Sequence, residues 1–308
     1  MLCMKSRCYH ACRRVLFPHL TGLTWLRGYM RIAISADSTC DLPRELCEKY
    51  QVAISPLSIL KDGQSFKDQL EITPAQVIEA AEHGSHITTS AVNVSEYEQL
   101  FRSLMSDHDA VIHFSLGAEF STSYANACVA ARPMEQVHVI DTRNLHTGSA
   151  LPLLRACEMA AEGAELGDIL LEVSRIIPRV CAGFLTTDIE YLRKGGRCSS
   201  AAAFTARIMG IRPSIDLIDG KMEMGRKYRG SLEHSLKHYL KDRLSDPAAD
   251  LSRAFVSHTV CDPKALDTFL SLVREYSPFK EIILADAGCV ISAHCGPGTF
   301  AVFYMRKG

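Results

Sequence analysis

The sequence lacks the features typical of nucleic-acid-binding, membrane and disulfide-rich proteins. Its 34 basic and 35 acidic residues leave a formal net charge of −1, so no excess charge favours nucleic acid or an anionic membrane surface. No apolar run reaches the roughly 20 residues that a membrane-spanning helix needs. We therefore expect a soluble chain that neither binds nucleic acid nor inserts stably into a membrane.

The common enzyme motifs are also absent. The chain has no G-x-S-x-G elbow, no phosphate-binding loop ending in G-K-S or G-K-T, and no H-E-x-x-H. No G-x-G-x-x-G follows the first predicted strand, so a dinucleotide site of that kind is not expected either. The sequence predicts no metal site, no cofactor and no catalytic residue.

Cysteine, in contrast, is abundant, with 12 residues in the chain. Beyond the first thirty residues the cysteines occur singly, without the paired spacing of a metal site or a disulfide framework. Such a distribution is typical of reduced, buried thiols, which favours a cytoplasmic protein.

Residues 1–29 differ from the rest of the chain. This segment contains no acidic residue, and its apolar stretch is broken by Pro18 and Gly22, which makes it a poor signal peptide. Met30 directly precedes the first clean strand pattern. We expect residues 1–29 to be a poorly ordered, dispensable extension, with Met30 as the natural start.

From residue 31 onward, strand and helix patterns alternate. Repeated strand–helix units indicate a mostly parallel sheet that is covered on both faces. The predicted elements of this first domain, residues 31–178, are strands at 31–35, 52–59, 110–115 and 137–140, helices opened by Asp41-Leu42-Pro43 and Thr73-Pro74, and helices at 148–162 and 166–177.

The pattern restarts near Val180 and predicts a second α/β domain over residues 179–308. Asp219-Gly220 is a strong signal for a hairpin turn between two strands. The other predicted elements are a short helix opened by Asp188, helices near 231–244 and from Pro263, and strands at 181–185, 254–257, 281–284 and 300–304. The fold class is therefore α/β, with two α/β domains and mostly parallel or mixed sheets.

Two hydroxyl-rich clusters, Thr88-Thr89-Ser90 and Ser121–Tyr124, each precede a helical pattern. The first cluster leads into Ser95 and Glu98, which are spaced as a capping box. The second follows the buried strand at 110–115. Ligands of α/β proteins bind at the carboxyl edge of the sheet, where helix N-termini favour anions. The hydroxyls either cap two helices or hold a ligand there.

Three further stretches carry polar groups. Asp37–Pro43 follows the first strand and is either a loop at the ligand edge or a helix cap. Tyr191–Arg197 places three cations around a glycine turn, an arrangement typical of a solvated helix C-terminus. His294–Gly298 is predicted to be a rigid turn with one histidine, which either binds a ligand or is hydrogen-bonded internally.

In this order the stretches resemble the DegV family of bacterial fatty-acid-binding proteins, over roughly Arg31 to Arg306. Each marker is short, but their order along the chain is specific. The markers are D-S-T-x-D-L-P at Asp37–Pro43, Pro56-Leu57 with Gly63 and Asp68, Thr89-Ser90, Ser121–Tyr124, Tyr191–Arg197, and His294 with Gly296-Pro297-Gly298. The resemblance implies two α/β domains with a long-chain fatty acid in a closed apolar tunnel between them.

The resemblance also implies roles for individual residues. It implies that Thr89, Ser121 and His294 hold the fatty-acid carboxylate, with Ser90 close by. It places Arg197 and Arg193 near the pocket mouth or on the surface that meets a partner. The sequence departs from the family pattern in two clusters: Thr89-Ser90-Ala91-Val92-Asn93 stands for T-S-Q-P-S, and Phe120–Tyr124 stands for L-S-G-T-Y. Thr122 thus replaces a glycine, and Cys295 replaces the usual threonine after the histidine.

We therefore expect a cytoplasmic protein that binds a long-chain fatty acid and presents it to a partner kinase, which forms the acyl phosphate. On this hypothesis the chain itself performs no chemistry. The main alternative is a small-molecule hydrolase or transferase that uses Ser121 or Cys295 together with His294. A third hypothesis is a lipid sensor without a kinase partner.

Overall fold

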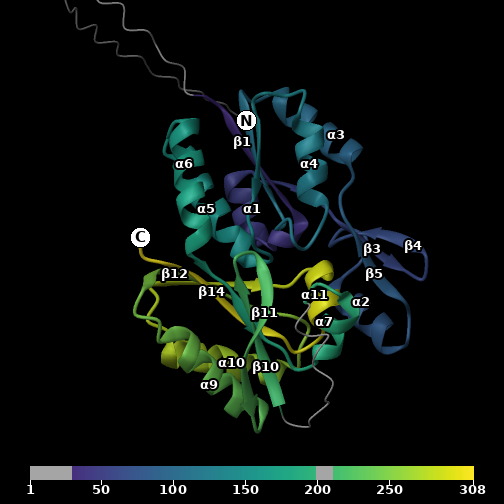
Figure 1. Ribbon diagram of the computed structural model, residues 1–308, viewed down its shortest axis with the longest axis vertical. Helices are drawn as coiled ribbons and strands as arrows, with labels where there is room; N and C mark the ends of the chain where they lie inside the picture. Colours follow the sequence, from purple (N-terminus) through teal and green to yellow (C-terminus); the bar gives the residue numbers. More distant parts are fainter. Residues whose placement is uncertain (1–29, 199–210) are drawn as a thin grey trace, which may run out of the picture.

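The computed structural model describes residues 30–198 and 211–308. The predicted extension, residues 1–29, lies outside the described residues. Figure 1 shows the first half of the chain, purple to teal, above the second half, green to yellow, with α11 and α7 where the two meet. In the described part of the chain no helix is long and apolar enough to cross a membrane.

The first half is built on a four-stranded parallel sheet, as predicted. Its strand order is β2-β1-β6-β7. All six residues of β6 are buried, as expected for a strand covered on both faces. Figure 1 places α3 and α4 to one side of this sheet and α5 and α6 to the other. The bounds are β1 Ile32–Asp37, β2 Ala53–Ser55, β6 Ala110–Ser115, β7 Val137–Asp141, α1 Arg44–Tyr50, α2 Pro74–Glu82, α3 Val94–Met105, α4 Ser123–Ala131, α5 Thr147–Ala161 and α6 Leu166–Ile176.

The prediction of one strand over residues 52–59 was wrong. Pro56 has no backbone N–H to donate and separates β2 from a new strand, β3 (Ser58–Lys61). β3 belongs to a small antiparallel sheet with β4 (Gln64–Lys67) and β5 (Ile87–Ser90), in the order β4-β3-β5. Thr88-Thr89-Ser90 therefore lies in a strand.

Two predicted helix caps were also wrong. α1 begins at Arg44 after Pro43, and Asp41 is a left-handed residue with φ 44° that follows a short 3-10 turn, Ser38–Cys40. The capping box of α3 is formed by Asn93 and Glu96 instead of Ser95 and Glu98. The N–H of Glu96 donates to Asn93 Oδ1 over 3.0 Å. Asn93 takes the N-cap position because it directly precedes the first helical residue, where its side chain can accept a hydrogen bond from a backbone N–H of the first turn.

The second half contains a mixed sheet in the order β11-β10-β9-β14-β12-β13, with β8 paired to β14. β12 and β13 are parallel, and the other pairs are antiparallel. The turn at Asp219-Gly220 joins β10 to β11, and both residues have positive φ, as predicted for this hairpin. The strands are β8 Val180–Cys181, β9 Gly183–Leu185, β10 Ile211–Ile218, β11 Lys221–Arg229, β12 Ala249–His258, β13 Glu281–Asp286 and β14 Phe300–Arg306.

Helices complete this half, and one of them was not predicted. α11 covers Cys289–Cys295, so His294 lies in the last turn of a helix and only the following glycines form the predicted turn. α7 begins after the predicted Asp188 cap and ends at Gly195. The helices are α7 Ile189–Gly195, α9 Leu232–Leu244, α10 Pro263–Tyr276 and α11 Cys289–Cys295.

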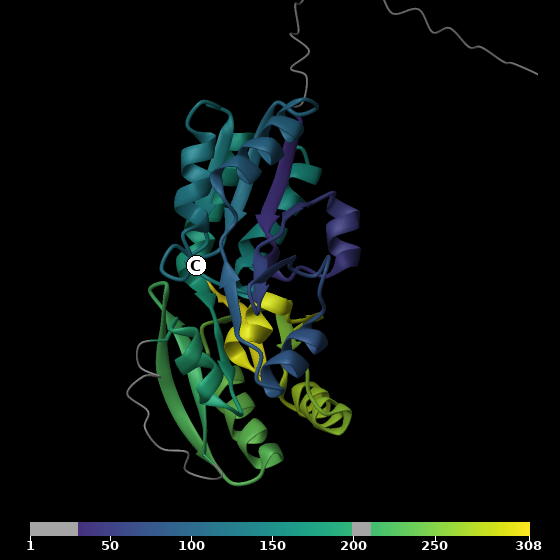
Figure 2. The same cartoon turned by 90° about the vertical axis from the view of Figure 1, so that its right-hand side faces the viewer.

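The hydrophobic core is shared by the two halves. One cluster of buried apolar residues extends from β1 and β6 through α5 to Phe303 on β14. A second cluster, which includes Phe269 and Phe300, lies around α9, α10 and the sheet of the second half. Figure 2 shows from the side that α11, in yellow, lies between elements of the two halves. The division at residues 178 and 179 remains a proposal. The nine cysteines of the described residues are free thiols.

Candidate functional site

A pocket of about 720 Å³ lies between the two halves of the chain. Its volume is within the range of roughly 300–1,000 Å³ that is usual for small-molecule sites. The first half contributes one wall through β5 and the loop that enters α4, and the second half contributes the other through α11. The lining includes Leu57, Thr89, Ser90, Leu116, Phe120, Ser121, Thr122, Leu145, Arg197, Met222, Val290, Ile291, His294 and Cys295.

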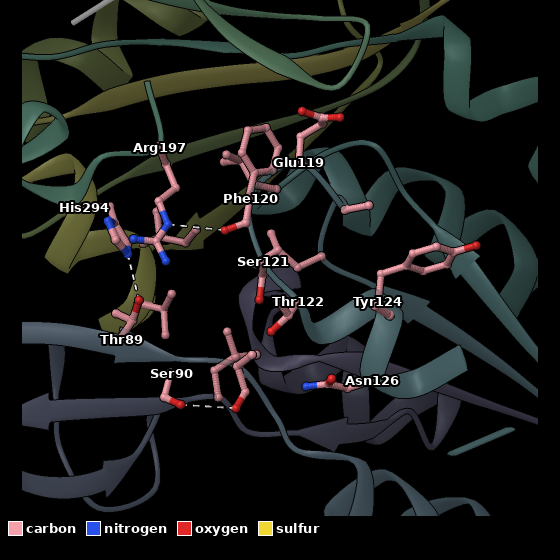
Figure 3. Close-up of a pocket in the computed structure, with 18 of the residues that line it drawn as sticks. Thr89, Ser90, Glu119, Phe120, Ser121, Thr122, Tyr124, Asn126, Arg197 and His294 are labelled. Atoms are coloured by element: carbon pink, nitrogen blue, oxygen red, sulfur yellow. Dashed lines mark hydrogen bonds between the residues drawn. The ribbon is translucent and has the colours of Figure 1, made fainter. Parts of the chain in front are cut away.

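Thr89 and His294 form a hydrogen-bonded pair in this pocket. Thr89 Oγ1 lies 2.9 Å from His294 Nε2, although the two residues are 205 positions apart in the chain. Figure 3 shows the pair as a dashed contact, with Ser90 beside Thr89 and Arg197 beside His294. The structure thus brings two of the predicted carboxylate-binding residues together.

Asp68 positions the helix that carries His294. Its Oδ1 accepts a 2.9 Å hydrogen bond from the backbone N–H of Cys289, at the start of α11. Its Oδ2 accepts a 2.6 Å bond from the Ser38 hydroxyl, directly after β1. Burial, and then the charge of Asp41, raise the pKa of Asp68 to about 6. The Asp37–Pro43 stretch therefore contributes to the site indirectly, by anchoring α11.

The second ring nitrogen of His294 abuts Gly195. A Cβ at Gly195 would overlap with His294 Nδ1, and a Cβ at Gly296 would collide with the Tyr191 ring. Within the described residues Nδ1 has no hydrogen-bond partner and is buried. Burial, and then the charge of Arg197, lower the pKa of His294 to about 4. The imidazole is consequently neutral near pH 7.

Ser121 lies two residues before the start of α4. Its Oγ accepts a 3.1 Å hydrogen bond from the backbone N–H of Ser123 and lies 3.0 Å from the Ser123 hydroxyl. Ser121 lines the same pocket as Thr89 and His294. When the Ser123 hydroxyl is the donor in this pair, the O–H of Ser121 is available to donate to a ligand. Ser90 also lines the pocket, and its hydroxyl makes a long 3.5 Å contact with the Ala91 carbonyl.

Arg197 links the two halves at the pocket. Its Nη1 donates to the Gly195 carbonyl over 2.8 Å, and its Nε donates to the Phe120 carbonyl over 3.3 Å. A second cavity, of about 600 Å³, is bordered by β5 and α7 and is also lined by Arg197, Thr89 and His294. Arg193, in contrast, pairs with Glu190 over 2.8 Å on α7 and is not part of the pocket lining.

Thr122 and Cys295, two of the departures from the family pattern, line the pocket. Thr122 faces it just before α4 begins. Cys295 is buried, and burial raises the pKa of its thiol to about 12. It separates the pocket from a small inner cavity of about 10 Å³, which Leu145 and Ile291 also border.

The apolar part of the pocket was not predicted residue by residue. Leu116, Leu145, Met222 and Ile291 line it, but their sequence context is that of ordinary core positions. The sequence indicates only a helix C-terminus around Gly195, whereas in the structure its lack of a side chain admits His294. No local sequence signal distinguishes such residues from the rest of the core.

Comparisons with known proteins agree on one family. A family model described as "Uncharacterised protein, DegV family" matches residues 31–307. A DegV domain-containing protein of Caldanaerobacter subterraneus is 29% identical over 280 residues, covering 90% of this chain and 99% of that one. A second, from Clostridium acetobutylicum, is 28% identical over 282 residues, with the same coverage.

Solved structures of fatty-acid-binding proteins have a similar fold. A DegV family protein of Thermus thermophilus, described as binding a fatty acid, has a TM-score of 0.80 at 27% identity. The comparison covers 90% of this chain and 100% of that one. A stearic-acid-binding protein of Eubacterium ventriosum has a TM-score of 0.81 at 25% identity, covering 90% and 98%. The predicted α/β fold is thereby confirmed.

Proposed function

The chain belongs to the DegV family, and from this premise we propose that it binds a long-chain fatty acid in the pocket between its halves. The Thr89–His294 pair carries the proposal, because it joins two hydrogen-bonding side chains from opposite halves beside a cavity with polar and apolar lining. Similar structures at 25–27% identity are described as fatty-acid-binding proteins, which supports the same ligand class here.

The alkyl tail supplies most of the binding free energy. A C16 chain has about 15 methylene and methyl groups, worth roughly 0.8 kcal/mol each, so its burial gains on the order of 10 kcal/mol. Association consumes about half or more of this gain, which leaves micromolar or tighter affinity. The tail packs against the apolar lining residues Leu145, Ile291 and Cys295, which separate the pocket from the small inner cavity.

The hydroxyl groups and the histidine orient the carboxylate. His294 Nδ1 is buried without a hydrogen-bond acceptor in the described part of the chain, so we assign the proton of the neutral ring to Nε2. Nε2–H then donates to Thr89 Oγ1, and the Thr89 hydroxyl is free to donate to a carboxylate oxygen. Ser121 donates from the other wall, and Ser90 is close by. Such donors hold the anion without the bidentate clamp of a buried arginine, so the carboxylate stays nucleophilic.

A nucleophilic carboxylate suits a protein that presents its ligand to a separate kinase. Arg197 lies at the junction of the two halves, with both cavities beside it, and Arg193 is exposed on the same helix–turn segment. We place the partner surface around these two guanidinium groups. The partner is a fatty acid kinase, which transfers a phosphoryl group to the carboxylate. In this proposal the cytoplasmic chain performs no chemistry itself and needs no cofactor.

The hydrolase hypothesis requires an activated nucleophile, and the geometry favours binding instead. His294 Nε2 is engaged by Thr89, whereas a general base would face Ser121 or Cys295. The thiol of Cys295, with its pKa raised to about 12, is protonated at neutral pH and is a poor nucleophile. The lipid-sensor hypothesis shares the ligand with our proposal and differs only in the partner.

Mass spectrometry of the purified protein tests the proposal. We expect the native mass to exceed the denatured mass by that of a C16 to C18 fatty acid. After delipidation, labelled palmitate should bind, and hexadecanol should bind at least tenfold more weakly, because the alcohol lacks the anion that the donors orient. An empty pocket with no palmitate binding, together with ester hydrolysis that Ser121→Ala abolishes, would establish the hydrolase instead.

A further inference from the structure

Three side chains converge at the carboxyl ends of β12 and β13, outside the proposed fatty-acid site. The two strands are parallel, with His258 in register with Asp286, so their final residues lie side by side. His258 Nε2 is 3.1 Å from Asp286 Oδ1, and His258 Nδ1 is 3.8 Å from Cys261 Sγ. We propose that this cluster makes Cys261 a reactive thiolate that takes low-molecular-weight disulfides.

The hydrogen bonds of His258 require an imidazolium. Nε2 faces the carboxylate of Asp286, and Nδ1 faces the Thr259 carbonyl at 3.0 Å as well as the sulfur of Cys261. A carboxylate and a carbonyl oxygen only accept hydrogen bonds, so both ring nitrogens must carry a proton. A fixed positive charge therefore lies beside the sulfur of Cys261.

The surroundings support this charge state. Burial of the ring lowers the pKa of His258, but its hydrogen bonds to Asp286, Cys261 and the Thr259 carbonyl outweigh that effect and raise it to about 10. The same pair lowers the pKa of Asp286. The order of nucleophile, histidine and orienting carboxylate is the arrangement that activates cysteine in thiol-dependent enzymes.

The other charged groups nearby are already engaged or exposed. Asp262 accepts hydrogen bonds from the backbone N–H groups of Lys264 and Ala265 and thereby caps α10. The Lys264 residue is exposed. On the opposite side, His146 faces the inner cavity that His258 also borders, and its Nδ1 is held 2.6 Å from Asp41 Oδ2. Among the charged groups of the described residues, the His258 imidazolium is the one within hydrogen-bonding reach of the Cys261 sulfur.

Cys47 provides a matched comparison within the same chain. It is half-buried, like Cys261, but its thiol donates to the Leu42 carbonyl over 3.5 Å. Burial raises the pKa of Cys47. The two cysteines thus differ in their chemical environment more than in their exposure.

The proposed reaction is a balanced thiol–disulfide exchange. The Cys261 thiolate attacks one sulfur of glutathione disulfide, and a new S–S bond forms between the protein and that glutathione. The original S–S bond breaks, and the second glutathione leaves as a thiolate that takes a proton from solvent. The reduced protein is recovered when another thiol attacks the mixed disulfide.

Alkylation at low pH tests the proposal. At about pH 5.5 an ordinary thiol of pKa about 8.5 is ionised to about one part in a thousand, so its alkylation nearly stops. The intact protein is treated with limiting iodoacetamide, and peptide mapping measures the rate at each cysteine. We expect Cys261 to react at least about tenfold faster than Cys47, and glutathione disulfide to label Cys261 first. In urea the two rates should become equal.

Variants isolate the cause of the reactivity. Asp286 is suitable because 86% of its side chain is exposed, so Asp286→Asn should fold normally. We expect this variant to slow alkylation of Cys261 at least about fivefold, and His258→Gln to reduce it to the rate of Cys47. Asp267→Asn, at an exposed carboxylate of α10, is the matched control and should change nothing. A Cys261 rate equal to that of Cys47 in the native protein, or unchanged by Asp286→Asn, overturns the proposal.

Discussion

Two buried histidines, His113 and His294, differ in what surrounds them. His113, in the centre of the parallel sheet, is fully buried, and its Nδ1 lies 3.0 Å from the Ser35 hydroxyl. Tyr97 and Phe101 contact its ring edge-on. His294 instead lines a cavity, with Thr89 on one nitrogen and the Gly195 backbone at the other. The first histidine is enclosed by packed neighbours, whereas the second faces free volume.

The carboxylate beside His113 shows what a closed polar network contributes. Asp37 accepts hydrogen bonds from the hydroxyls of Tyr97 and Ser115, at 2.5 and 2.8 Å, and from the backbone N–H of Leu116 at 2.8 Å. All of these groups belong to the first half of the chain. Thr89 and His294 come from different halves, so their contact depends on how the halves dock. The comparison leads to four predictions.

Removal of the Asp37 carboxylate should have the largest effect. Asp37→Ala leaves three buried donors without an acceptor, which we expect to lower the free energy of unfolding by about 3–5 kcal/mol. Urea denaturation measures the change. Asp109→Ala removes a carboxylate whose partner, Arg31, is exposed, and it should cost less than about 1 kcal/mol. Equal losses in the two variants would contradict the distinction between closed and exposed networks.

The buried, neutral His294 should make stability depend on pH. Above pH 6.5 the histidine is neutral in the folded and the unfolded chain, so it contributes no slope. Between pH 6.5 and about 4 the unfolded chain binds a proton that the folded chain does not, so stability falls as pH falls, by up to roughly 3 kcal/mol. Below about pH 4 the contribution is constant.

Urea unfolding of the ligand-free protein at several pH values measures this slope. His294→Gln should remove this contribution, because glutamine does not titrate. The contribution of Asp68 should remain and has the opposite sign, because its raised pKa lets the folded chain hold a proton between about pH 6 and 4 that the unfolded chain releases. His83 is a suitable control: it is exposed, and His83→Gln should leave the profile unchanged. If His294→Gln shows the same slope as the wild-type protein, the pH dependence of stability comes from other groups.

The proposed head-group site should respond to single hydroxyl deletions. Loss of a hydrogen bond to a charged group costs about 1.5–3 kcal/mol, so Thr89→Ala and Ser121→Ala should each weaken palmitate binding roughly 10- to 100-fold. Thr89→Ser keeps the hydroxyl and should bind almost normally. The double variant should show coupling, since both hydroxyls hold one anion. If the losses are strictly additive, the two hydroxyls contact separate groups of the ligand. If every variant keeps full affinity, the head-group site lies elsewhere in the protein.

The smallest expected effect concerns Gly195, whose backbone lies against the imidazole of His294. A methyl group at Gly195 overlaps with His294 Nδ1, so Gly195→Ala should displace the imidazole and weaken palmitate binding about tenfold. Gly167→Ala on α6 is the matched control, because an added Cβ there meets nothing within 4 Å. Isothermal titration of both variants measures the difference. Equal affinities would show that the ring can move without consequence.

Local sequence patterns predicted much of the fold. The continuous apolar run at 110–115 gave a fully buried strand, Thr73-Pro74 opened a helix, and Asp219-Gly220 formed the hairpin turn. These features depend on neighbours within a few residues. The failures also have local causes: Pro56 interrupted a strand, and Asn93 took the capping position from Ser95.

The sequence by itself determined the α/β elements and the hydroxyl-rich clusters, because hydrophobic period and turn chemistry act over short distances. Only the tertiary structure decided that Thr89 meets His294 across 205 positions and that Gly195 gives the imidazole its space. Those contacts depend on where α11 docks between the halves, which Asp68 and the shared core control. A helix of seven residues carries too weak a local signal to predict that position.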